Sequence, residues 1–148
     1  MTANDLAFLS LNEQAELIHR GELSPVTLVE AYLGRIERHD DSLKAFITIE
    51  AEAALAAAKA AEDEIQAGNY RSALHGIPFA VKDQILIKGV RVTGGSKVLS
   101  NHIGQRDATL IARLKKLVLS CLVRSTRTSF TWVPLGTSRS VHPETHGI

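Results

Sequence analysis

The chain has 148 residues, of which 45% are hydrophobic and 22% are charged, and its formal net charge is +1 at pH 7. This length suffices for one domain with a hydrophobic core. A net charge so close to zero gives no electrostatic reason to expect a nucleic acid or an acidic partner. The only cysteine, Cys121, excludes an internal disulfide and is typical of a reducing compartment. We see no signal peptide and no apolar run long enough to span a membrane, so we expect a cytoplasmic protein.

Two capping patterns predict helices near the N-terminus. Ser10 is followed three residues later by Glu13, which is a capping box at the start of a helix. Ser24 and Pro25 predict the start of a second helix, because proline at the first helical position lacks an N–H that would be unpaired anyway. The polar residues 40–42 are expected to end this second helix.

The next segment predicts a short strand and then a helix. Residues 43–49 include a β-branched and aromatic run that is typical of a strand. Residues 50–67 are rich in alanine, which has the highest helix propensity, and Gly68 is placed to follow the helix end. We expect this helix to be a solvent-facing scaffold element.

A short apolar run leads to a lysine in the middle of the chain. The run Ile77–Val81 is bounded by glycine and proline, which predicts a buried strand. Lys82 and Asp83 follow directly, and the glycine-rich turn 93–96 comes after a second apolar run. Functional residues are commonly found at strand ends in α/β sheets. Taken alone, however, such features are more typical of a solvated charge and an ordinary turn.

The whole segment carries more information than its parts. The string GIPFAVKD, followed by Gly89 and then by Thr93-Gly94-Gly95-Ser96, closely resembles the amidase signature family. Members typically carry a G-I-P-x-x-V-K-D strand and then a T-x-G-S loop, preceded by helices in the order predicted here. The resemblance covers roughly residues 6–116. It implies an α/β fold in which helices pack on a mixed sheet, present here as an N-terminal portion and therefore incomplete.

The resemblance implies a catalytic role for Lys82. In the family this lysine acts with two serines, one in a cis peptide and one that is the nucleophile. A lysine can act as a base only while its amine is neutral, and burial favours the neutral form. The lysine deprotonates the cis serine, which takes the proton of the nucleophilic serine, and backbone N–H groups stabilise the oxyanion. An acyl-enzyme forms, ammonia or an amine leaves, and water completes the hydrolysis.

No metal or organic cofactor is implied, the substrate would be a small-molecule amide, and the substrate-binding residues are unknown.

The remaining candidate residues are interpreted as structural residues near the site: Asp83, Gly94, Gly95 and Ser96. Asp83 is expected to support the local structure, with an exposed turn charge as an equal alternative. Ser96 belongs to the T-x-G-S loop and matches neither catalytic serine, since in the family both lie further along the chain than Ile148. The chain therefore carries one of three catalytic residues, and we expect it to have no amidase activity by itself.

A polar loop and a helix are expected after the glycine-rich turn. Residues 101–106 are polar. Asp107 is a candidate cap for a helix with Leu110, Ile111 and Leu114 on its apolar face.

The family pattern breaks after Lys116. Acidic residues nearly vanish over 117–148, and neither a helical nor an alternating period is present. If one G is restored between the codons of Lys116 and Leu117, the chain can be re-read as A-G-A-V-L-L-G-K-I-N-T-H-E-F over 117–130 and as T-P-R-N-P-W-D near its end. Both strings resemble the family at this distance from the lysine strand.

These observations predict the N-terminal part of an amidase signature domain over 1–116 and an aberrant, out-of-frame tail over 117–148. The break is either a real mutation or a sequencing error, and a natural divergent tail is the alternative. Two other functions stay open: the amide-hydrolysing component of a glutamyl-tRNA amidotransferase, and a non-catalytic binding module. The oligomeric state is not predicted.

Overall fold

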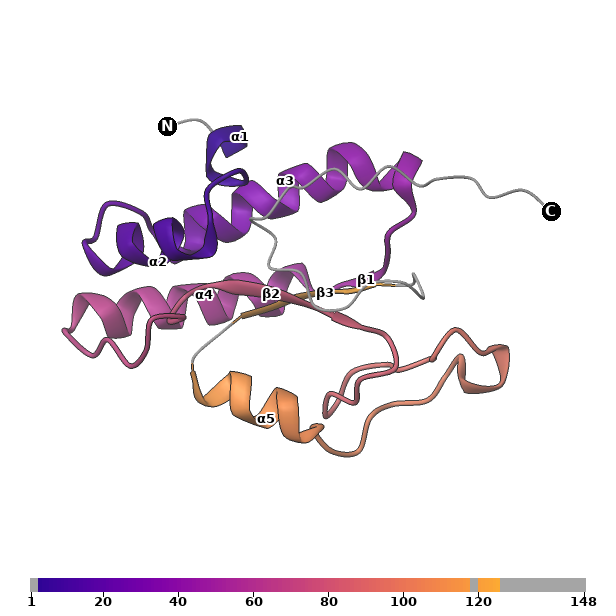
Figure 1. Cartoon of the computed structure of the whole chain (residues 1–148). Coiled ribbons are helices and arrows are strands. Elements are labelled where there is room, and N and C mark those ends of the chain that lie inside the picture. The colour runs from indigo at the N-terminus through magenta and orange to yellow at the C-terminus, as the bar shows by residue number, and fades with distance from the viewer. Residues whose placement is uncertain (1–2, 118–119, 126–148) are drawn as a thin grey trace.

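The computed structural model describes residues 3–117 and 120–125. Helices lie on both sides of a small sheet: α2, α3 and α4 on one side and α5 on the other (Figure 1). In chain order the elements are α1 (Ala3–Leu6), α2 (Leu11–His19), α3 (Pro25–Leu43), β1 (Phe46–Ile49), α4 (Ala51–Gln66), β2 (Pro78–Lys82), the 3₁₀-helix η1 (Lys97–Leu99), α5 (Thr109–Lys116) and β3 (Ser120–Ser125). No helix within the described residues is long and apolar enough to cross a lipid bilayer.

Both predicted capping patterns are confirmed. The backbone N–H of Ser10 donates to Glu13 Oε2 at 2.7 Å, and the N–H of Glu13 donates to Ser10 Oγ at 3.3 Å, which completes the capping box of α2. Ser24 Oγ accepts from the N–H of Val26 at 3.1 Å, and Pro25 is the first residue of α3. Local hydrogen bonds of this kind satisfy the N–H groups that a helix leaves unpaired at its start.

The prediction that residues 40–42 end α3 is wrong, because the helix continues to Leu43. Asp40 acts from inside the last turn: its Oδ1 atom accepts from the backbone N–H of Ala45 at 2.7 Å and of Phe46 at 3.2 Å. Lys44 then adopts a left-handed conformation with φ of 46°, which reverses the chain into β1. The carboxylate therefore directs the exit from the helix.

Helix α4 is not the solvent-facing scaffold that we expected from its composition. Ala54, Ala58 and Ala61 lie one turn apart and are at most 1% exposed. The small alanine side chains allow a close approach of α4 to α3 and to the sheet, so the same residues that favour the helix also form its buried face.

The three described strands form the mixed sheet that was predicted, in the order β1-β3-β2. Strand β3 pairs antiparallel with β1 and parallel with β2, and Ser125 lies opposite both Phe46 and Lys82. The sequence of 117–148, read as it stands, gave no signal for this strand. Apart from Leu117 and β3, the predicted tail lies outside the described residues.

Strand β2 contributes to two separate apolar clusters. Ala80 packs against the cluster built by the N-terminal helices, together with Ile77 just before the strand. Phe79 and Val81 belong to a second cluster on the other side, with residues of α5 and of the loop after β2. This division matches the alternation of side chains along a strand.

Asp107 does not cap α5, contrary to the prediction. The N-cap is Ala108, which makes no side-chain hydrogen bond to the helix. The Asp107 carboxylate instead accepts from the backbone N–H of Lys88 at 2.8 Å and pairs with Lys115 Nζ at 2.9 Å. These contacts fasten the loop after β2 to the helix, and they also lower the pKa of Asp107.

The apolar face of α5 is narrower than predicted. Ile111 and Leu114 are buried at 0% and 8% exposure, whereas Leu110 is 46% exposed.

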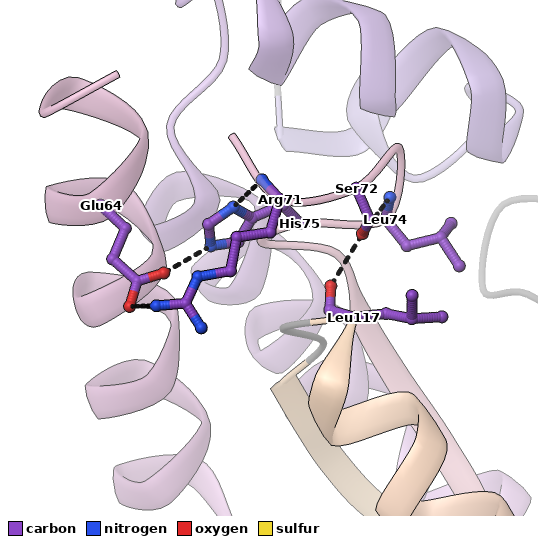
Figure 2. Close-up of polar contacts among 6 residues, drawn as sticks. All are labelled: Glu64, Arg71, Ser72, Leu74, His75 and Leu117. Atoms are coloured by element: carbon purple, nitrogen blue, oxygen red, sulfur yellow. Dashed lines mark hydrogen bonds and ion pairs between the residues drawn. The ribbon is translucent and has the colours of Figure 1, made fainter. Parts of the chain in front are cut away.

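The loop that enters β2 is held between α4 and the end of α5 (Figure 2). Arg71 pairs with Glu64 Oε1 at 2.6 Å, and its backbone N–H donates to His75 Nδ1 at 3.3 Å. Ser72 Oγ donates to the carbonyl oxygen of Leu117 at 2.9 Å. His75 is fully buried; its Nε2 lies 3.4 Å from Glu64 Oε2, and neither of these two atoms makes a hydrogen bond within the described residues.

Burial lowers the pKa of His75 from its ordinary value of 6.5; the Glu64 carboxylate opposes this shift and the Arg71 guanidinium adds to it. The unfolded chain therefore takes up a proton at this residue more readily than the folded chain does. We expect the free energy of unfolding to fall as pH drops below about 6.5, and His75→Gln to flatten this dependence. Denaturant unfolding at a series of pH values measures both slopes, and an equal slope in the two proteins would contradict the prediction.

Candidate active site

Lys82 is the last residue of β2 and is half-buried. The residues before it that anchor the strand, Pro78, Phe79 and Val81, are buried. Because successive strand residues point to opposite sides of a sheet, Lys82 lies on the side of Ala80, which faces the N-terminal helices. The strand thus presents an amine at its carboxyl end, on an apolar support.

Asp83 follows on the opposite side and is only 4% exposed. Its two carboxylate oxygens accept from the backbone N–H of Thr93, at 3.2 Å and 3.1 Å, and Oδ2 also accepts from the Thr93 hydroxyl. A buried carboxylate needs such donors to offset the loss of water. The alternative of an exposed turn charge does not describe this residue.

The glycine-rich turn is organised around Thr93. Thr93 Oγ1 accepts from the N–H of Gly95 at 3.1 Å, and the Thr93 carbonyl oxygen accepts from the N–H of Ser96 at 2.9 Å. Gly94 and Gly95 have φ of 56° and 74°, a region that residues with a Cβ rarely adopt. Ser96 is half-buried, and its Oγ accepts from the N–H of Val98 at the start of η1.

Sequence reasoning did not assign a role to Thr93. The contact between Asp83 and Thr93 spans ten residues, and no helical or strand period predicts a contact across an irregular loop. The nearest signal in the sequence is a threonine directly before two glycines, which is common in ordinary turns.

The segment expected as a polar loop forms the second arm of a hairpin. The N–H of Gly89 donates to the carbonyl oxygen of Gly104 at 2.9 Å, and the N–H of Val92 donates to that of His102 at 2.8 Å. Arg91 and Ile103 form an isolated β-bridge between these two bonds. The hairpin carries the glycine-rich turn at its end, so the position of the turn depends on the hairpin base.

In the part of the chain that the structure describes, no cluster of three or more His, Cys, Asp or Glu residues is arranged to hold a metal ion. The chemistry that the described residues offer is therefore that of one half-buried amine beside a hydrogen-bonded carboxylate and a glycine-rich turn.

A layered α/β arrangement with a lysine at the end of a buried strand defines a class, and the model of the amidase family matches the chain over residues 27–146. The chain belongs to the amidase family. The match begins inside α3 and continues past Lys116 into the predicted tail.

Curated relatives share the N-terminal part of the chain. It is 45% identical over 107 residues to one of the subunits of the glutamyl-tRNA(Gln) amidotransferase of Roseiflexus sp., a match that covers 72% of this chain and 22% of that protein. It is 43% identical over 112 residues to the corresponding protein from Geobacter metallireducens, covering 76% and 23%. The chain thus spans only about a fifth of the length of these relatives.

Solved structures of the family have the same fold over this part. Fatty acid amide hydrolase superposes with a TM-score of 0.79 at 25% identity, covering 84% of this chain and 22% of that chain. The peptide amidase of Stenotrophomonas maltophilia superposes with a TM-score of 0.73 at 31% identity, covering 78% and 24%. The predicted α/β fold, incomplete and belonging to this family, is confirmed.

The base of the hairpin provides a test of packing near the site. A Cβ atom at Gly104 would lie 2.3 Å from the carbonyl oxygen of Ile87, whereas a Cβ at Gly34 in α3 would meet nothing within 4 Å. We expect Gly104→Ala to destabilise the protein by roughly 1–3 kcal/mol, because the backbone must move. The matched variant Gly34→Ala should stabilise it by about 0.5–1 kcal/mol, since alanine favours a helix. Unfolding midpoints measure both; equal midpoints would refute the steric argument.

Proposed function

We propose that the intact protein hydrolyses a carboxylic amide to the acid and ammonia or an amine, with Lys82 as the catalytic lysine. The observation that carries this proposal is the half-buried Lys82 at the end of β2, within a chain that belongs to the amidase family. A lysine in this setting suits a base, because partial burial favours the neutral amine. Fatty acid amide hydrolase and the peptide amidase, which share the fold, carry amide chemistry in their names.

The two serines of the proposed mechanism belong to the part of the amidase domain that this chain does not span. The cis serine would pass a proton to Lys82 and take one from the nucleophilic serine, which attacks the amide carbonyl. Asp83 and the turn Gly94-Gly95-Ser96 serve as structural residues next to the site in this proposal. The sole cysteine, Cys121, is typical of a reducing compartment and supports a cytoplasmic location.

A second candidate is the amide-hydrolysing component of a glutamyl-tRNA amidotransferase. The relatives with 42–45% identity carry the name of this amidotransferase, whereas the solved amidases are 25–32% identical. Glutamine would then be the amide, and the ammonia would pass to a partner protein. Ammonia release from glutamine that depends on added partner proteins would favour this candidate, and release from simple amides by the protein alone would favour the first.

We also propose that residues 117–148 are the product of a shifted reading frame. The support is the agreement of the re-read codons with the family pattern after Lys116. Strand β3 lies within this segment, and its ladder with β1 and β2 uses backbone groups that every reading frame supplies, proline aside.

Sequencing the DNA across the codons of Lys116 and Leu117, and onward past that of Ile148, tests the reading frame. We expect one additional base and an open frame that continues into glycine- and serine-rich segments. A sequence that stands unchanged would refute a sequencing error, and a closed frame downstream would point to a disrupted gene.

Activity tests the role of Lys82. The 148-residue chain should release no ammonia from amides, because it lacks both serines. In the protein with the restored frame, we expect Lys82→Ala to lower kcat/KM by roughly 10⁴-fold or more, as loss of a catalytic group does in triads that act as a unit. Lys88→Ala, which removes an exposed lysine six residues further on, should leave activity near that of the parent. Similar losses in both variants would exclude a specific role for Lys82.

A further inference from the structure

The carboxylate of Asp83 is the most buried acidic group that the structure describes, and it stands next to Lys82 in the chain. It accepts the backbone N–H and the hydroxyl of the same residue, Thr93. A single side chain thus closes the ten-residue excursion between the end of β2 and the glycine-rich turn. We name the contacts between Asp83 and Thr93 the clamp.

The clamp acts on two structures at once. On one side, Asp83 fixes the backbone at the end of β2, and the preceding residue, Lys82, can then point only to the opposite side of the sheet. On the other side, Thr93 holds Gly95 and Ser96 through two further hydrogen bonds. The orientation of the lysine and the location of the turn are therefore set by one carboxylate.

The strand alone does not supply this restraint. Lys82 is the last residue of β2, and the chain leaves the sheet at Asp83. The last residue of a strand has hydrogen-bonded neighbours on one side only, so its backbone dihedrals are less restrained than those of Phe79 or Val81. A buried hydrogen-bonded group directly after the strand removes this freedom.

The geometry points to Asp83 as a positioning residue that fixes the direction of the Lys82 side chain, and to Thr93 as the residue through which it acts. This inference deepens the proposed function, because Lys82 is the amine concerned. Asp83 itself does not touch a reacting group in this scheme; it acts through the backbone and through Thr93.

The chemistry of the clamp dictates the variants. In Asp83→Asn, one carboxylate oxygen becomes an NH₂ group that faces the N–H of Thr93, so two donors oppose each other. Thr93→Val keeps the shape of the side chain and removes the hydroxyl. Thr93→Ser keeps the hydroxyl and serves as the rescue variant. The matched control is Asp107→Asn, since Asp107 also fastens a loop through a backbone N–H but has no contact with the clamp among the bonds described.

The test labels amines in the full 148-residue chain and needs no catalytic turnover. Each variant is treated with trace acetic anhydride at a fixed alkaline pH, and the acetylation of Lys82 is measured by peptide mass spectrometry relative to Lys116, which is exposed. In the parent chain we expect Lys82 to react more slowly than Lys116. The ratio should rise about tenfold in Asp83→Asn and Thr93→Val, the effect of losing one hydrogen bond to a charged group.

Thr93→Ser and Asp107→Asn should both keep the parent ratio. Because the ratio is internal to each molecule, a variant that merely loosens the whole fold raises both lysines and leaves the ratio unchanged, which would overturn the inference. Equal labelling of Lys82 and Lys116 in the parent chain would overturn it too, since no restraint on Lys82 would then exist. If Asp83→Asn fails to fold by circular dichroism, the comparison of Thr93→Val with Thr93→Ser decides.

Failure of this test and failure of the proposed function are distinguishable. A missing clamp effect leaves the loss of activity in Lys82→Ala untouched, and an active Lys82→Ala enzyme leaves the labelling result untouched.

Discussion

The placement of β2 between two apolar clusters is the constraint on which the rest of the structure depends. Ala80 is fixed by the N-terminal helices, and Phe79 and Val81 are fixed by α5 and the loop after the strand. Burying both faces of one strand removes apolar area from water on each side, at roughly 25 cal/mol per Å². The strand therefore cannot rotate or slide by one residue without exposing one cluster, and its end, with Lys82, has a defined position.

Local signals in the sequence were sufficient for most of the helix starts and for the strand before Lys82. Capping by Ser10 and Ser24 depends on residues within three positions, so a single sequence reveals it. The burial of α4 was missed because alanine is both a good helix former and a small residue that suits close packing, and composition alone does not separate the two. Asp107 was misjudged because Lys88 and Lys115 compete for its carboxylate from positions that only the fold brings together.

The candidate site divides in the same way. Lys82 and the glycine-rich turn were found through a motif, whereas the buried state of Asp83 and the role of Thr93 required coordinates. A pairing across ten irregular residues has no periodicity for sequence reasoning to use. The family relationship, now shown by the match over 27–146, explains why the motif was informative where its single residues were not.

The order of the strands has a consequence for synthesis of the chain. Strand β3 occupies the centre of the described sheet, between β1 and β2, yet it is the last of the three to leave the ribosome. Until it emerges, β1 and β2 have no hydrogen-bonding partner in this sheet, and their edges are open to other chains. Any event that stops translation before residue 125 would thus release a nascent protein whose lysine strand is made but unpaired, a natural substrate for chaperones.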